Sequence, residues 1–572
     1  MTASVGLSEK RTAFFDSAKN YLDQKTAQLD WRKLWPKRSR VAPLAASASD
    51  ANEPVTQADR ALVVSSIGLG LATLGVLGQP LLGLASLPVA VYLCRGRFQV
   101  AYRVLRDERR ITPPVLDATR VVVCVAMGYS FIAALDAWLQ TVTQKVLVQS
   151  EVDFQRRLEE QFGKLPETVY VFTKGTEVAI APDAMNLGDV IAIESGEAAP
   201  TNGLILYGSA WVNEALATGA TQPIFKQVGD QLHAATVVLG ERLYVQTEAN
   251  NSKNPALHIQ EALPRTVESK SYMQQVGEAS GQRAAPYLMA LFAVTIPFWG
   301  VNRAAAFLTA SLGSQMRTLG PFTLRNFVNQ AAQQGILIKD GRVLERACLL
   351  NTIIIDAEVL TDPALHDQAR TTIAQLRGRR WPAVEITRQP FAVYVLGVGT
   401  DSAQEAQMSQ LAQTIGADDC LLAASPAARA EVLEGLQSNG RFIGYIGAAN
   451  TEPNVMKQAA VAMTVGGAAG MDADAVQLVL TAQTLAQLDQ FFDLATDFVG
   501  KQIFNISWPL FMDVVDISTT VFVHLGLVYS IFFTYAGTLT GLMNARTSLH
   551  RHEAKVEQEQ VAKALSASAS HQ

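Results

Sequence analysis

Cysteine is scarce in this sequence: there are four in 572 residues, and no two of them form a CxxC pair. They are Cys94, Cys124, Cys348 and Cys420. This spacing excludes a disulfide framework and thiol-based chemistry. It also indicates that the soluble parts of the chain face a reducing compartment.

An excess of positive charge is also missing, because the formal net charge is -5. Nucleic acid is therefore not an expected partner. The first 60 residues are polar and charged, so we expect no cleavable signal peptide. A chain of this length is too long for one hydrophobic core and predicts several structural units.

Long apolar runs are present, and they occur in pairs. We expect about eight spanning helices in a lipid bilayer, counting the longest run as two, although several of the runs are short or carry polar residues. The runs are 61–78, 81–93, 115–148 (a hairpin turning near Gly128), 285–300, 304–327, 498–519 and 521–542.

Arginine is concentrated on one side of these spans. Residues 94–110 carry six arginines next to the second span, whereas the loops expected on the opposite side carry almost none. By the positive-inside rule, both termini and both soluble stretches should be cytoplasmic. The expected location is a bacterial-type cytoplasmic (inner) membrane, crossed several times.

The soluble stretches differ in pattern. Residues 150–275 alternate short β-branched runs with turn residues, which predicts an all-β domain, and residues 335–490 alternate strand and helix patterns. The expected organisation is an N-terminal region with an amphipathic helix (1–60), four transmembrane helices (61–150), the β domain (151–275), two transmembrane helices (284–334), the α/β domain (335–490), two transmembrane helices (497–546) and a tail (547–572).

The β stretch also carries an ordered set of motifs. Residues 188–236 contain GD, GE, PTNG, VNE, TGATQP and KQVGD in that order. This order resembles the actuator domain of heavy-metal-transporting P-type ATPases. GILIKDGRVLE at 335–345 and MNAR at 543–546 are similar to the segments that enter the phosphorylation domain and end the last span of that family. The resemblance implies a membrane helical bundle with an actuator-like domain and a doubly wound, HAD-like phosphorylation domain.

The resemblance also identifies departures from the family's catalytic motifs. In NTIIIDAEVLTDP, Asp356 stands at the position of the phosphorylated aspartate of DKTGTLT. Ala357 replaces the lysine and Glu358 replaces the first threonine. Loss of one preorganised donor costs about 3–4 kcal/mol of transition-state stabilisation. Asp356 is therefore interpreted as a polar cap at the end of a strand.

The other catalytic loops depart as well. Ala448 and Thr451 stand where the family's GDGIND loop has its two aspartates, and Ala220 stands where TGES has the glutamate that activates water. Fewer than a hundred residues separate Asp356 from Ala448, which leaves no room for the family's nucleotide-binding insertion. We therefore expect no magnesium or ATP site, and a chain that is not an enzyme.

The spans themselves carry unusual polar residues. The family's CPC-like position falls on 312–314, where no soft ligand is present, and Arg317 follows. In the seventh span Asp513 and Asp516 are three residues apart, and Met512 precedes them. Intramembrane carboxylates are functional candidates. One hypothesis makes these three residues a divalent-cation site. The other pairs one or both aspartates with Arg317, and the absence of other ligands favours it.

These observations lead to two hypotheses about function. The first is a truncated, catalytically inactive homologue of these ATPases that serves as a scaffold or regulatory subunit in a complex with other membrane proteins. The alternative is a heavy-metal cation transporter that binds or passes a divalent cation through the carboxylates of the seventh span.

Overall fold

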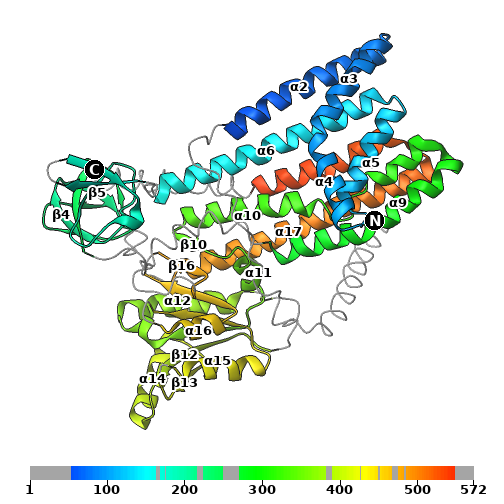
Figure 1. Ribbon diagram of the computed structural model, residues 1–572. Coiled ribbons are helices and arrows are strands. Elements are labelled where there is room, and N and C mark those ends of the chain that lie inside the picture. The colour runs from blue at the N-terminus through cyan, green and yellow to red at the C-terminus, as the bar shows by residue number, and fades with distance from the viewer. Residues whose placement is uncertain are drawn as a thin grey trace, which may run out of the picture.

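A computed structural model shows a long helical bundle with a β domain beyond one end and an α/β domain beside it (Figure 1). It describes residues 53–162, 168–173, 176–214, 223–248, 270–379, 381, 389–425, 427–448, 451–466, 475–481 and 485–547. The amphipathic helix predicted before residue 53 and the tail after residue 547 lie outside these ranges.

The bundle is formed by segments from both ends of the described chain. Helix α10 lies against α6, α9 and α17, and α6 also lies against α2 and α3. The helices are α2 (Glu53–Val76), α3 (Pro80–Leu93), α4 (Arg95–Asp107), α5 (Pro113–Ala126), α6 (Ser130–Phe162), α9 (Tyr272–Ala304), α10 (Met316–Gln333), α17 (Gln487–Ser518) and a last helix over 527–547, with the short turns η5 (Ala305–Leu308) and η7 (Thr519–Val523).

Fewer helices than expected meet the length and composition of a membrane span. Among the described residues three are long and apolar enough to cross a bilayer, and a fourth crossing exists if the bent pair α3–α4 is one span. Helices α3 and α5 have 14 residues each, fewer than the ~20 that a span needs. The predicted number of eight spans is therefore not confirmed.

The arginine-rich segment after the second run is a helix of its own. The chain bends by 54° between α3 and α4, and α4 carries four of the six arginines of residues 94–110. Only Ala101 is buried in α4. A helix with this polarity suits the boundary between membrane and water rather than the bilayer interior.

The described residues of the β domain form nine short strands in two sheets, ordered β2-β1-β3-β9-β4-β7 and β6-β5-β8. Alternate residues of β9 are buried, as expected for strands with one face on a core. The strands are β1 (Val169–Thr173), β2 (Thr176–Ile180), β3 (Val190–Ile193), β4 (Gly203–Tyr207), β5 (Ala210–Asn213), β6 (Ile224–Lys226), β7 (Gln231–Leu232), β8 (Val237–Val238) and β9 (Leu243–Thr247).

The α/β domain has one seven-stranded sheet, ordered β10-β16-β15-β14-β11-β12-β13. Its strands are β10 (Ile336–Ile338), β11 (Thr352–Asp356), β12 (Ala392–Val398), β13 (Asp419–Ala423), β14 (Ile443–Gly447), β15 (Val461–Val465) and β16 (Leu478–Leu480). Its helices are α11 (Val343–Ala347), α12 (Ala364–Gly378), α14 (Ser402–Ile415), α15 (Arg429–Ser438) and α16 (Pro453–Gln458), with the turn η6 (Ala357–Leu360).

Strand β11 lies in the middle of this sheet and is buried along its whole length. It is parallel to β12 on one side and to β14 on the other. Such a position is the switch point of a doubly wound sheet, where ligands usually bind beyond the carboxyl ends of the strands. The chain therefore places Asp356 at the edge of the sheet where a site is expected.

Candidate functional site

The first candidate site lies inside the helical bundle, where the chain between η5 and α10 is not helical. Residues 309–315 form turns, with positive φ at Leu312 (42°) and Gly313 (97°). A glycine is needed at the second of these positions, because an L side chain is strained there. The segment exposes backbone groups and hydroxyls to α17. Irregular backbone at membrane depth is tolerated where it is buried in protein or lines a cavity.

Two carboxylates of α17 face this unwound segment. The Asp513 Oδ2 atom accepts hydrogen bonds from the Ser311 hydroxyl (2.7 Å) and the Leu312 backbone N–H (2.6 Å). The Asp516 Oδ2 atom accepts from the Thr309 hydroxyl (2.9 Å). Each aspartate is 1% exposed. The spacing of three residues thus brings both carboxylates to one face of α17, as the sequence predicted.

These carboxylates lack a cationic partner among the described residues, because their hydrogen-bond donors are hydroxyls and one backbone N–H. The Asp516 Oδ1 atom is buried without a hydrogen bond, and the Ser530 side chain of the last helix lies beside Asp516. Burial of ionised carboxylates without a counter-charge is costly. The arrangement is therefore incomplete for two ionised aspartates.

The predicted ion pair with Arg317 is wrong. Arg317 is exposed on the first turn of α10 and lines a surface cavity. The break at 309–315 separates Arg317 from the turn that contacts Asp513, so helical spacing from the preceding run does not apply. Met512 is half-buried and lies against Gly537 of the last helix. A Cβ atom added to Gly537 would lie 3.6 Å from the Met512 Cβ atom.

The sequence did not predict that the hydroxyls of Thr309 and Ser311 donate hydrogen bonds to these carboxylates. Thr309 and Ser311 lie in an apolar run, FLTASLGS, and a hydroxyl in such a run often bonds its own helix backbone. Because residues 309–315 are not helical, these hydroxyls can donate to the aspartates of α17 instead. The signal available beforehand was the combination of small residues and Gly313 at the family's ligand position.

A cavity of about 180 Å³ leads to this segment. Its lining includes Thr309 and Ser311, which hold the carboxylates, and the exposed Arg317. Farther out, Asp136 of α6 accepts from Arg97 (2.6 Å) and Arg120 (3.0 Å). Since Asp136 bridges two guanidiniums and Asp117 lies 3.4 Å from Arg120, the two arginines of this cluster are balanced by two carboxylates.

The second candidate site is the end of β11. Asp356 is fully buried, its Oδ2 atom accepts from the Tyr445 hydroxyl (2.5 Å), and Arg429 Nη1 lies 3.0 Å from the same atom. Arg429 also donates to Glu358 (2.5 Å). Burial raises the pKa of the Asp356 carboxyl, although Tyr445 and Arg429 act against this shift. Burial and the neighbouring Asp356 also raise the pKa of Tyr445, which keeps its proton on the hydroxyl.

The other residues predicted around Asp356 contribute little to this cluster. Ala357 and Ala448 are half-buried, and the Thr451 hydroxyl is buried without a hydrogen bond. Ala220 lies outside the described residues. The described residues here do not fit a magnesium ion, because protein donors already occupy the Asp356 carboxylate and no second carboxylate stands at 448 or 451.

Replacing Tyr445 with phenylalanine tests the importance of this cluster for the α/β domain. We expect the free energy of unfolding to fall by about 1.5–3 kcal/mol, because a buried carboxylate loses a hydrogen-bond donor. Urea unfolding of the full chain in detergent, followed by fluorescence, measures this change. Tyr394→Phe on β12 is the matched control, since the Tyr394 hydroxyl has no hydrogen-bond partner among the described residues. Equal effects of the two substitutions would contradict the assignment.

Known proteins resemble different parts of the chain. Residues 163–263 match the P-type ATPase actuator domain. The chain is 23% identical over 289 residues to copper-exporting P-type ATPase B of Archaeoglobus fulgidus, an alignment that spans 47% of this chain and 42% of that protein. It is 25% identical over 307 residues to the manganese-exporting P-type ATPase of Mycobacterium tuberculosis, spanning 50% and 43%. The chain thus matches less than half the length of these curated relatives.

Among solved structures, a zinc-transporting PIB-type ATPase in the E2.Pi state aligns with 88% of this chain and 100% of that one, at 15% identity and a TM-score of 0.46.

These relatives correct one expectation from the sequence. The prediction that the chain is not an enzyme is wrong on this comparison, because the relatives that it matches are named as ATPases. The scaffold hypothesis gains no support from them. The transporter alternative is favoured, since the relatives are named as exporters of copper and manganese.

Proposed function

The chain belongs to the heavy-metal-transporting P-type ATPase family, and we propose that its membrane domain binds a divalent cation at Asp513 and Asp516 and passes it across the bilayer. The soluble domains would lie on the cytoplasmic side. The arginines of α4, which follow the second apolar run, support this orientation.

One observation carries the proposal: Asp513 and Asp516 are buried side by side in α17, and only neutral groups donate to them. Two negative charges in this position need either protons or a cation. A divalent ion would neutralise both carboxylates and bind the Asp516 Oδ1 atom, which is buried without a hydrogen bond.

The donor chemistry favours a hard cation. The groups around the proposed site are carboxylates and the hydroxyls of Ser311, Thr309 and Ser530, and cysteine and histidine do not appear among them. Oxygen donors suit Mg²⁺, Ca²⁺ and Mn²⁺, whereas thiolate and thioether ligands select Cu(I). We therefore propose Mn²⁺ or a similar hard divalent ion, in keeping with the manganese exporter among the relatives.

Transport in proteoliposomes tests this function. We expect the wild-type chain to move Mn²⁺ faster than Cu(I), and Asp516→Asn to reduce the Mn²⁺ flux to that of empty liposomes, because the ion loses a charged ligand. Flux is measured with a Mn²⁺-quenched dye, with and without MgATP. The two conditions detect both ATP-driven transport and passive passage of Mn²⁺. Asp493→Asn is the control, since Asp493 lies on the same helix but is exposed. Equal flux in wild type and Asp516→Asn would contradict the proposal.

A further inference from the structure

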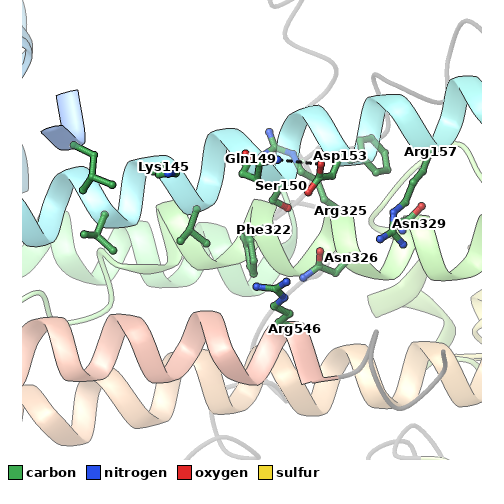
Figure 2. A pocket seen from close by; sticks show the side chains of 14 residues that line it. Lys145, Gln149, Ser150, Asp153, Arg157, Phe322, Arg325, Asn326, Asn329 and Arg546 are labelled. Atoms are coloured by element: carbon green, nitrogen blue, oxygen red, sulfur yellow. Dashed lines mark hydrogen bonds between the residues drawn. The ribbon is translucent and has the colours of Figure 1, made fainter. Parts of the chain in front are cut away.

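A separate cavity lies at the other end of α10, away from the carboxylates of α17. It has a volume of about 270 Å³ and is lined by α2, α6, α10 and the last helix. Figure 2 shows Lys145, Gln149, Asp153 and Arg157 along α6, facing residues of α10 across the cavity. Nothing in the proposed transport route uses these residues.

The position of the cavity follows from the connections of its helices. Helix α6 leads toward the β domain and α10 leads directly into β10 of the α/β domain. The cavity is lined by residues 322–329 of α10, residues 142–157 of α6 and Arg546, next to the carboxyl end of the last helix at 547. It therefore lies toward the end of the bundle that carries both soluble domains (Figure 1), which is the end where we expect lipid headgroups to meet the bundle.

The walls of the cavity combine two kinds of chemistry. Leu62, Val142, Val146 and Phe322 give it an apolar part toward the middle of the bundle. Phe154 adds a second apolar contact, and polar groups occupy the rest: the cations Lys145, Arg157, Arg325 and Arg546, the amides Gln149, Asn326 and Asn329, the Ser150 hydroxyl and one carboxylate, Asp153, which accepts a hydrogen bond from Gln149. A ligand that fits both parts has an anionic group joined to an apolar chain.

The cations of the cavity are only partly neutralised. Arg325 pairs with Glu151, and Lys145 pairs with Asp59 at 2.7 Å. The Arg325 Nε atom is nevertheless buried without a hydrogen-bond acceptor. Arg546 at the end of the last helix points toward Phe322 and Asn326 (Figure 2) and has no carboxylate partner among the described residues. Arg546 and the unused Nε donor of Arg325, which come from different helices, are thus available to one anion.

We propose that this cavity binds the phosphate of an anionic phospholipid, with Arg325 and Arg546 as its main ligands. Basic pockets between membrane helices on the cytoplasmic side recognise such headgroups, and guanidinium groups suit phosphate oxygens. The volume is below the roughly 300–1,000 Å³ of sites for drug-sized ligands, which favours a headgroup over a nucleotide. A lipid held here would join α6, α10 and the last helix beside the soluble domains.

Native mass spectrometry of the full chain, with dioleoyl phosphatidylglycerol titrated into detergent, tests the proposal. We expect one tightly retained lipid per wild-type chain, and an apparent affinity about five-fold lower in each of Arg546→Gln and Arg325→Gln, because each removes about one surface-charge contribution. Arg303→Gln is the matched control. Arg303 is an exposed arginine near the carboxyl end of α9 and does not line this cavity.

The outcomes separate a lipid from a free anion. Binding of phosphatidylglycerol that greatly exceeds binding of dioleoyl phosphatidylcholine, and that falls in Arg546→Gln but not in Arg303→Gln, supports the proposal. Equal retention of both lipids would overturn it. Displacement of bound phosphatidylglycerol by millimolar inorganic phosphate would also overturn it. The phosphate group alone would then account for binding, and the acyl chains would contribute nothing. Arg546 is exposed, so its variant is informative even if Arg325→Gln fails to fold.

Discussion

Asp136→Asn is expected to destabilise the membrane domain by about 3–5 kcal/mol, because it leaves the buried Arg120 and the largely buried Arg97 side chain without their shared carboxylate. The Asp136 side chain is 3% exposed, and those of Arg97 and Arg120 are 12% and 6% exposed. Tyr535 of the last helix also donates to Asp136, at 3.1 Å. Four helices, α4, α5, α6 and the last helix, therefore meet at this one side chain. The loss is measured as the shift in the thermal unfolding midpoint of the full chain in detergent.

Asp117→Asn is the control for this prediction. Asp117 contacts the same Arg120, but at 3.4 Å and with 37% of its side chain exposed. An ion pair of this exposure contributes about 0–1 kcal/mol. Similar shifts for the two variants would show that Asp136 is not the shared counter-charge of Arg97 and Arg120.

Asp516→Asn is expected to weaken Mn²⁺ binding by more than ten-fold while leaving the metal-free protein as stable as wild type or more stable. Affinity falls because the ion loses an anionic ligand, and loss of an outer-shell partner alone costs 10–100-fold at metal sites. Stability does not fall, because asparagine removes a buried charge that only neutral groups contact. Isothermal titration with Mn²⁺ and thermal unfolding in a chelator measure the two quantities on one preparation.

This pair of readouts separates a ligand from a structural residue. If Asp516 only held the helices together, the substitution would lower the unfolding midpoint in the chelator and change Mn²⁺ affinity little. That pattern would contradict the assignment of Asp516 to a cation site.

The sequence predicted the parts of this structure that depend on local patterns. The apolar run at 285–300 lies in α9, the run at 498–519 lies in α17 and the first residue of η7, and the β-branched run before Asp356 is in β11. The i, i+3 spacing of Asp513 and Asp516 placed both on one face of a helix. These features follow from periodicity, which a sequence shows directly.

Contacts between distant segments could not be predicted in the same way. Tyr445, which lies 89 residues after Asp356, donates a hydrogen bond to it. Arg97 of α4 pairs with Asp136 of α6, although the sequence indicated only that the arginine-rich segment flanks the second span. The error over Arg317 has a local cause. A helix was assumed to run through 304–327, but the chain unwinds at 309–315 and α10 begins at Met316.

Metal content after equilibrium dialysis tests the central claim most directly, that the buried carboxylates of α17 hold a divalent cation. Wild type, the double variant Asp513→Asn/Asp516→Asn and the control Asp493→Asn are dialysed together against micromolar Mn²⁺, and bound metal is measured by mass spectrometry. The account predicts about one Mn²⁺ per chain in wild type and the control and none above background in the double variant. Equal metal content in all three proteins, or none in any of them, would contradict it.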